Sequence, residues 1–235
     1  MKTNLRIKLF DRNTILLFIF IILFSSVNPV YAENVAGKVI KSSGDVYAQL
    51  EAQEKRSLKI GKSIYEKDQI FTEDNASVTL LFSDKTRFEL GPESTLLVNK
   101  YLYENNVDKD LTSIDVVKGT FRFVSGLIAK EKPEAMEVNT AVATIGIRGT
   151  NVIGKADATS ATIILTEPED KSHKTAIEVF NKFGSVTIDE PGYGTEIPDE
   201  YSPPSPPRRM SLQTINNLTR SLQRSVQRLN LPRPR

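Results

Sequence analysis

Short hydrophobic runs separated by turn formers fill the chain from about Val35 to Ile188. In Arg87–Leu90 and Thr120–Val124, apolar and polar residues alternate, which predicts strands with one face toward water. Val78–Phe82 has only one polar residue, so we expect a strand that is buried on both faces. The pattern predicts an all-β fold, either a sandwich-like domain or an irregular β-solenoid.

The composition changes between Pro198 and Pro207, where five of ten residues are proline. Such a segment fits neither a central strand nor a helix, and it favours an extended polyproline II conformation. We therefore predict a β domain over residues 33–190, followed by a proline-rich linker over residues 191–208.

Beyond the linker, the hydrophobic period becomes helical. The apolar residues are spaced by three or four positions and form a stripe about 120° wide on a helix; they are Leu212, Ile215, Leu218, Leu222, Val226 and Leu229. Arg220, Arg224 and Arg228 fall on the opposite face. A basic amphipathic helix is therefore predicted within residues 209–235, and it ends before Pro232.

Two roles are open for this helix. Its apolar face can fold back over the β domain of the same chain, or it can dock on a partner or an anionic membrane surface. The stripe carries no Trp or Phe that would anchor it at a membrane interface, which favours a protein contact. The candidate partner-contact residues on the helix are Leu218, Leu222, Val226, Arg220, Arg224 and Arg228.

The N-terminus has the three parts of a signal peptide. Four of its first twelve residues are basic, ten apolar residues follow at Ile15–Phe24, and Val30–Ala32 ends on a small residue. We predict a signal peptide at residues 1–32 with cleavage after Ala32, and hence a periplasmic or secreted protein. An uncleaved anchor is the alternative, but Asn28 and Pro29 end the apolar stretch before the ~20 residues that a membrane span needs.

Cysteine is absent and histidine occurs once, which excludes disulfides and thiol catalysis and argues against a zinc site. Residues 33–207 carry a net charge of −8, whereas residues 208–235 carry seven Arg and no acid. This asymmetry favours contact between the tail and an acidic surface, in the same chain or in a partner. We expect no nucleic-acid partner, because a signal peptide directs the chain out of the cytoplasm.

The residues that could support catalysis do not form a convincing set. His173 lies in a charged stretch beside Ser172, and neighbours in sequence do not make a base–nucleophile pair. Glu167 and Glu169 could be drawn as a glycosidase pair, but a solvated acidic loop explains them better. We therefore predict a non-enzymatic protein with no cofactor and no metal.

Nine short motifs follow one another along the chain: Gly37–Val39, Gly44–Val46, Leu58–Gly61, Ile64–Thr72, Ser77–Asp84, Leu90–Ser94, Val117–Phe123, Ser125–Gly126 and Thr140–Thr150. Together they resemble the FecR domain family, the extracytoplasmic domain of regulators of iron-siderophore uptake and of many secreted bacterial proteins. The resemblance runs from about Val35 to Lys155 and implies a small β-solenoid or sandwich-like domain. Because only fourteen residues precede the apolar run, it implies the stand-alone secreted type.

Two aspartates within these motifs, and the lysine that follows one of them, bear on local structure. Asp68 and Asp84 are natural turn residues, because a short carboxylate accepts hydrogen bonds from nearby backbone N–H groups. The family usually has Gly after the second Asp, where this chain has Lys85. A non-Gly residue at positive φ costs about 1 kcal/mol, so either the turn differs or the strain is tolerated.

Arg148 lies in the glycine-bounded run Ile145–Thr150. It is either a structural corner residue, with its guanidinium on a carboxylate or on backbone carbonyls, or part of a contact site. We include it among the candidate partner contacts.

These observations predict a non-enzymatic extracytoplasmic protein that mediates protein–protein interaction, sensing or signalling in the bacterial envelope. Its partner would be another envelope protein, bound through an exposed strand edge or the basic helix. The alternative is a structural envelope module that binds peptidoglycan or an outer-membrane protein. Peripheral contact with the membrane or with peptidoglycan is open in both interpretations.

Overall fold

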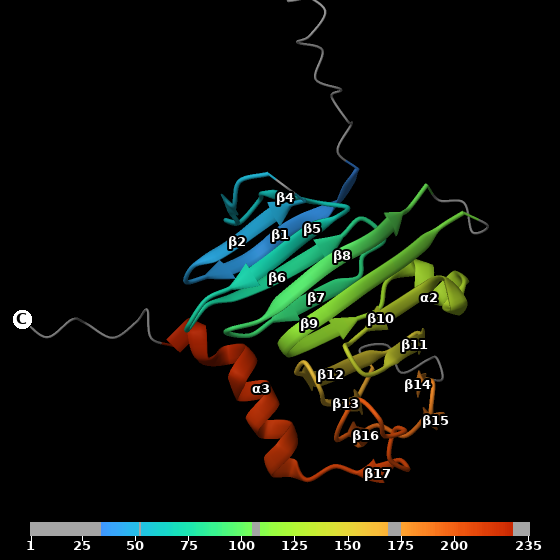
Figure 1. The fold of residues 1–235 in the computed structure, drawn as a ribbon. Coiled ribbons are helices and arrows are strands. Elements are labelled where there is room, and N and C mark those ends of the chain that lie inside the picture. The colour runs from blue at the N-terminus through green and yellow to red at the C-terminus, as the bar shows by residue number, and fades with distance from the viewer. Residues whose placement is uncertain (1–33, 52, 105–108, 169–174, 228–235) are drawn as a thin grey trace, which may run out of the picture. The chain divides into compact units, whose positions relative to one another are not determined.

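The computed structural model describes residues 34–51, 53–104, 109–168 and 175–227. Their seventeen strands join in one hydrogen-bonded network, which forms two layers that share the long strand β9 (Leu111–Val124) (Figure 1). The strand pairs described are antiparallel, except that β9 runs parallel to β10 (Met136–Asn139). The predicted all-β class is confirmed, in a sandwich-like form. The predicted signal peptide lies outside the described residues.

The chain passes repeatedly between the two layers. The first layer has the order β4-β1-β6-β7-β9-β12-β13-β16-β17, and its other strands are β1 (Val35–Ser43), β4 (Ser63–Tyr65), β6 (Ser77–Phe82), β7 (Arg87–Leu90), β12 (Asn151–Ala156), β13 (Ala161–Thr166), β16 (Tyr193–Ile197) and β17 (Arg208–Arg209). The second has the order β3-β2-β5-β8-β9-β10-β11-β14-β15, with β2 (Val46–Leu50), β3 (Arg56–Ser57), β5 (Asp68–Thr72), β8 (Thr95–Leu102), β11 (Thr144–Arg148), β14 (Ala176–Asn181) and β15 (Gly184–Ile188). Each layer therefore collects strands from both halves of the sequence.

Strand β9 crosses from one layer to the other at Gly119. Leu111–Lys118 pair with β8 in the second layer, whereas Gly119–Val124 pair with β12 in the first. Gly119 has a φ of +109°, and a Cβ built there would lie 2.0 Å from Ser94 Oγ. Because both the conformation and the space exclude a side chain, only glycine fits this crossing.

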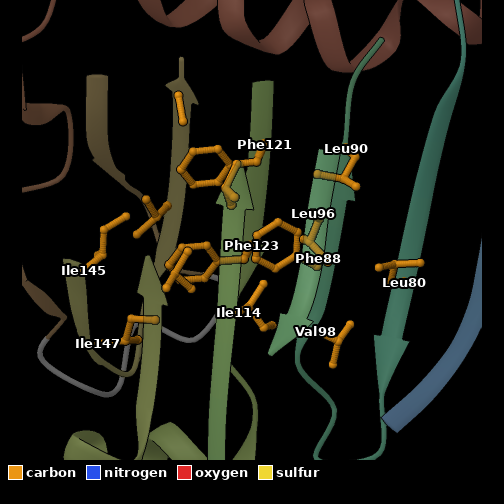
Figure 2. Close-up of a cluster of buried hydrophobic side chains, with 14 of the residues drawn as sticks. Leu80, Phe88, Leu90, Leu96, Val98, Ile114, Phe121, Phe123, Ile145 and Ile147 are labelled. Carbon is orange, nitrogen blue, oxygen red and sulfur yellow. The ribbon is translucent and has the colours of Figure 1, made fainter. Parts of the chain in front are cut away.

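The main core lies between the inner faces of the two layers. The rings of Phe88, Phe121 and Phe123 from the first layer stack with centroids 5.7 Å to 6.4 Å apart. Figure 2 shows these rings beside Leu96 and Ile114 of the second layer. Burial of such large apolar side chains is the dominant stabilising contribution in a fold without disulfides.

Strand β6 differs from its prediction. Val78, Leu80 and Phe82 are buried in the core, whereas Thr79 and Leu81 are partly exposed on the outer face. The expectation of burial on both faces was wrong, because only the inner face of the first layer is enclosed along the whole strand. Leu81, an apolar residue on the outer face, is enough to mask the alternation of apolar and polar residues in this short strand.

The proline-rich segment belongs to the β domain. β16 lies inside the predicted linker 191–208 and pairs with β13. Beyond it, the backbone N–H of Ser205 donates to the carbonyl oxygen of Glu196 at 3.0 Å, and Pro204 is buried. The predicted boundary at residue 190 is therefore too early. Prolines donate no backbone hydrogen bond, yet they still pack along a strand edge.

The described helical segments are α2 (Leu127–Glu131), η1 (Pro133–Ala135) and α3 (Leu212–Gln227). α3 is the helix that the apolar stripe predicts. Figure 1 shows it in red beside β9 and β12. None of the described helices is both long and apolar enough to cross a membrane.

Candidate functional site

The apolar face of α3 lies on the outer face of the first layer. There it forms a small cluster that consists of Leu218, Ile153, Ile164 and Met210, with Ile215 and Leu222 partly buried against it. Leu218 is 8% exposed, so the predicted contact residues Leu218 and Leu222 already touch the chain's own β domain. A partner that used these two side chains would first have to displace α3.

The predicted arginines of the helix fall in two groups. Arg220 is exposed, on the side of α3 away from the apolar cluster. Arg224 and Val226 lie within the bounds of α3, but their side chains are outside the described part of the chain, as is the whole of Arg228. Arg220 is thus the predicted contact residue that the structure places in solvent.

Arg148 lies in the other layer. It is the last residue of β11, where it pairs with Ala176, and Gly149 follows it with a φ of +61°. The chain therefore turns sharply after Arg148, as the glycine-bounded motif indicates, although the Arg148 side chain is outside the described part. The structure places this residue and the helix on different layers.

The outer face of the second layer carries a continuous row of side chains. Cross-strand register aligns eight of them from β2 to β15: Gln49, Gln69, Leu97, Asp115, Asn139, Thr144, Phe180 and Ser185. All eight are partly or fully exposed, whereas residues beside them in sequence, such as Ile70, Ile114 and Ile145, are buried. We call this surface the open face.

Hydrogen bonds between side chains fix the centre of the open face. Asn139 Nδ2 donates to Asp115 Oδ1 at 2.9 Å and to Ser113 Oγ at 3.2 Å. The hydroxyl of Thr144 donates to Asn139 Oδ1 at 2.8 Å. Three neighbouring strands, β9, β10 and β11, are therefore linked across their surface as well as through their backbones. Such a network holds the polar side chains in one orientation.

A hollow of about 350 Å³ opens in the open face beside Gly146. Glu137 and Glu178 are the cross-strand neighbours of Gly146 on its two sides, and Phe180 forms part of the wall. A Cβ on Gly146 would have no neighbour nearer than 3.8 Å, so the missing side chain leaves the hollow open. These residues are not among the contacts predicted from the sequence. The alternation in β11 indicates the face of Gly146, but the register that brings the two glutamates beside it depends on the fold.

Buried carboxylates hold the turns that the sequence predicts at Asp68 and Asp84. Asp84 is fully buried, and it accepts hydrogen bonds from the backbone N–H of Thr86 at 3.1 Å and from the Thr86 hydroxyl at 2.7 Å. Lys85, between them, has a φ of +73°, so the turn keeps the positive φ that a glycine would adopt. Asp68, also buried, accepts from the backbone N–H of Tyr65 at 2.8 Å. Both aspartates therefore act as turn residues.

Two tyrosines, Tyr101 in β8 and Tyr103 just after it, have raised pKa values. Burial, and then the negative charge of Asp84, raise the pKa of Tyr101 well above its ordinary value. Burial, and then the charges of Glu131, Asp84 and Asp110, raise the pKa of Tyr103. Perturbed groups often mark functional sites, but Tyr101 is 2% exposed and hydrogen-bonded within the protein. Its shift reflects its packing between the layers.

The described residues present two candidate surfaces and no candidate metal site. They contain no group of three His, Cys, Asp or Glu side chains that could hold a metal ion. His173 and Glu169 lie outside the described residues. The features that the geometry does assemble are the open face with its hollow, and the exposed face of α3.

Part of this chain is similar to known proteins. Residues 68–168, from β5 to just beyond β13, match the family described as FecR protein. Two solved structures from Parabacteroides distasonis, both described as candidate anti-sigma factors, are similar to this chain at 11% and 12% sequence identity, each with a TM-score of 0.48. Each match covers 65% of this chain and 64% of the other, which is less than two thirds of its length. No curated protein matches the sequence.

Proposed function

We propose that this chain, whose residues 68–168 form a FecR domain, acts outside the cytoplasm as a non-enzymatic module that binds another envelope protein in sensing or signalling. The observation that carries the proposal is the difference between its two outer faces. α3 lies on the face of the first layer, whereas the open face of the second layer presents an aligned row of eight side chains, six of them polar. A partner would bind at the open face.

The open face has the size and rigidity that a protein interface needs. Strands in a sheet lie about 4.8 Å apart, so a row across eight strands spans about 34 Å. That length is sufficient for an interface of standard area. The hydrogen bonds among Asp115, Asn139 and Thr144 fix these side chains in the free protein. Binding would therefore cost little side-chain entropy.

The proline-rich segment lies beside β15 and makes the edge of that strand a poor binding surface. This favours the open face as the place where a partner binds. A Cβ on Gly184, the first residue of β15, would lie 3.3 Å from Pro203 Cβ. Asn181 Nδ2 donates to the carbonyl oxygen of Ser202 at 2.9 Å. Proline beside a sheet edge discourages the addition of a foreign strand, because it provides no N–H group for the ladder.

The extracytoplasmic location rests on the predicted signal peptide and on the family. The n-region, apolar run and small residue at Ala32 follow the pattern of cleaved signals. A FecR domain is consistent with a role in the envelope. The stand-alone secreted form and the absence of catalysis are part of this proposal.

Site-specific photo-crosslinking in the native envelope tests the proposal. A photoreactive residue would replace Gln69 or Thr144 on the open face, with exposed Lys38 of the first layer as the matched control. We expect a defined partner band from the two open-face positions and none from Lys38. Crosslinks from Lys38 alone, or none from any position, would contradict the proposed surface.

A second comparison separates interaction from a purely structural role. The chain truncated after Pro207 lacks α3 but keeps every strand of the open face. We expect it to retain the crosslinked partner band. If the band disappears while the truncated chain stays folded, the partner binds α3 and the open face is not the interface.

A further inference from the structure

The solvent-exposed face of α3 carries amide side chains and an arginine but no acidic residue. Its exposed side chains in the described part are Leu212, Gln213, Asn216, Asn217, Arg220 and Gln223. Arg220 is the charged side chain among them, and from Leu212 to Gln227 the sequence contains one further Arg and no Asp, Glu or Lys. Residues 33–207 have a net charge of −8, so this face carries positive charge on an acidic protein.

The helix is held in a fixed orientation. Before it, the backbone N–H of Met210 donates to the carbonyl oxygen of Gly192 at 2.9 Å. At its start, the backbone N–H of Thr214 donates to Ser211 Oγ at 3.0 Å, which caps the first turn. Leu218 anchors its middle in the apolar cluster. The exposed amides and Arg220 are therefore presented together on one rigid surface.

We propose that this exposed face of α3 binds an anionic glycan of the cell envelope, namely a carboxylate-bearing polysaccharide such as peptidoglycan. An Asn or Gln amide carries a donor and an acceptor side by side, which suits sugar hydroxyls. An Arg guanidinium pairs with a carboxylate through two parallel hydrogen bonds. From Gln213 to Gln223 the row is about 15 Å long, so it fits an extended polymer.

The same face suits a membrane poorly. An interfacial helix needs apolar side chains directed into the lipid. In α3 the partly buried Ile215 and Leu222 pack toward the sheet with Leu218. Leu212, which is 77% exposed, is the large apolar side chain that α3 leaves in solvent within the described residues.

Cosedimentation of the mature chain with purified peptidoglycan sacculi at low ionic strength tests this inference. We expect the wild-type chain to pellet with the sacculi, and Arg220→Glu to reduce the bound fraction at least fivefold. Arg220→Lys keeps the charge but cannot form the two parallel hydrogen bonds, so it should bind less than the wild type and more than Arg220→Glu. Lys59→Glu makes the same change of charge at an exposed position in the turn before β4 and should bind as the wild type does.

A double change, Asn216→Ala with Asn217→Ala, separates glycan recognition from simple charge attraction. We expect it to weaken binding at least twofold, with the circular dichroism spectrum unchanged. The inference is overturned if the wild-type chain does not pellet, if Lys59→Glu and Arg220→Glu bind alike, or if the double variant binds fully. It is also overturned if anionic phospholipid vesicles bind the chain and sacculi do not.

This inference rests on the proposed extracytoplasmic location, but not on the open face. The two experiments therefore fail separately. Arg220→Glu should leave crosslinks from Gln69 and Thr144 intact, and loss of those crosslinks should leave binding to sacculi intact. If both hold, α3 attaches the protein to the wall while the open face remains available for a protein partner.

Discussion

The backbone N–H of Asp84 donates a hydrogen bond to the phenolic oxygen of Tyr101 at 2.9 Å, and that oxygen lies 3.4 Å from Asp84 Oδ1. Asp84 follows β6 in the first layer, whereas Tyr101 lies in β8 of the second. The ring of Tyr101 also lies 5.4 Å from that of Phe82. The turn that carries Asp84 is therefore tied to the opposite layer.

Asp84→Ala should destabilise the fold by about 3 kcal/mol, because it leaves the buried N–H and hydroxyl of Thr86 without an acceptor. Urea unfolding followed by circular dichroism measures this change. The control is Asp157→Ala, which removes an exposed carboxylate that pairs with the exposed Lys155 at 3.3 Å and should cost less than about 0.5 kcal/mol. Equal losses in the two variants would show that the Asp84 turn does not stabilise the fold.

The raised pKa of Tyr101 predicts a loss of stability at alkaline pH. The unfolded chain releases the proton near the ordinary pKa of 10.0, whereas the folded chain retains it at higher pH. The stabilising contribution is therefore complete below about pH 10 and is lost as the pH rises further, by up to about 1.4 kcal/mol per pH unit. Urea unfolding at several pH values between 9 and 11 measures this slope.

Tyr101→Phe should make the alkaline slope shallower, although the raised pKa of Tyr103 keeps part of it. The variant should also be less stable at neutral pH, since the Asp84 N–H loses its acceptor. Tyr201→Phe is the matched control, because Tyr201 is 70% exposed; it should leave the slope as it is. A slope that Tyr101→Phe leaves unchanged would assign the alkaline transition to other groups.

The sequence predicts the fold class because strand alternation and turn chemistry are local. Asp84 is recognisable as a turn residue from its type and its neighbours, and Arg87–Leu90 as a strand from its period. The prediction that the β domain ends at residue 190 was wrong, because the contacts that extend the domain are far apart in the sequence. β16 is recognised as a strand only by its pairing with β13, and Pro204 is buried only because that pair gives it a surface to cover.

Lys85→Gly should stabilise the protein by about 0.5 kcal/mol. The φ of +73° at Lys85 costs a non-Gly residue about 1–2 kcal/mol, and glycine returns part of that gain through the greater entropy of the unfolded chain. Lys59→Gly is the control, since Lys59 is not among the residues with positive φ, and it should lower stability slightly. Thermal unfolding of both variants beside the wild type measures the difference. A lower midpoint for Lys85→Gly would mean that the Lys85 side chain stabilises the turn.

Gly119→Ala should prevent folding or cost at least ~4 kcal/mol. The new methyl would meet Ser94 Oγ at 2.0 Å and Ser94 Cβ at 2.4 Å, at a φ of +109°. Gly61→Ala shares the positive φ, at +83°, but a Cβ there has no neighbour within 4 Å. It should therefore cost only about 1 kcal/mol. Soluble yield and urea midpoints compare the two, and similar losses would refute a steric origin.

The two candidate surfaces could be predicted from the sequence only in part. The spacing of Leu218 and Leu222 identifies the apolar face of α3, and the opposite face follows from it. That apolar face covers Ile153 and Ile164. These two residues lie on adjacent strands, and their adjacency follows from the strand order, which the sequence pattern does not reveal. The row on the open face cannot be predicted from the sequence either. Asn139 meets its partners Asp115 and Thr144 only because of the register between strands.

Leu218→Ala should test whether α3 is held on its own chain. Leu218 is 8% exposed and packs with Ile153, Ile164 and Met210, so its truncation should cost about 2 kcal/mol. Because this cluster is separate from the main core, the loss should appear as local opening. Hydrogen exchange of α3 amides should accelerate by up to about thirtyfold relative to exchange in β9.

Leu212→Ala is the matched control for this change. Leu212 lies in the same helix but is 77% exposed, so its truncation should cost less than about 0.5 kcal/mol and leave α3 exchange nearly unchanged. If Leu218→Ala and Leu212→Ala behave alike, α3 does not rest on β12 and β13 in solution. Its apolar stripe would then be free for a partner, and the glycan-binding face would lose the support that orients it. If only Leu218→Ala loosens the helix, the basic face points outward because the apolar face is already bound.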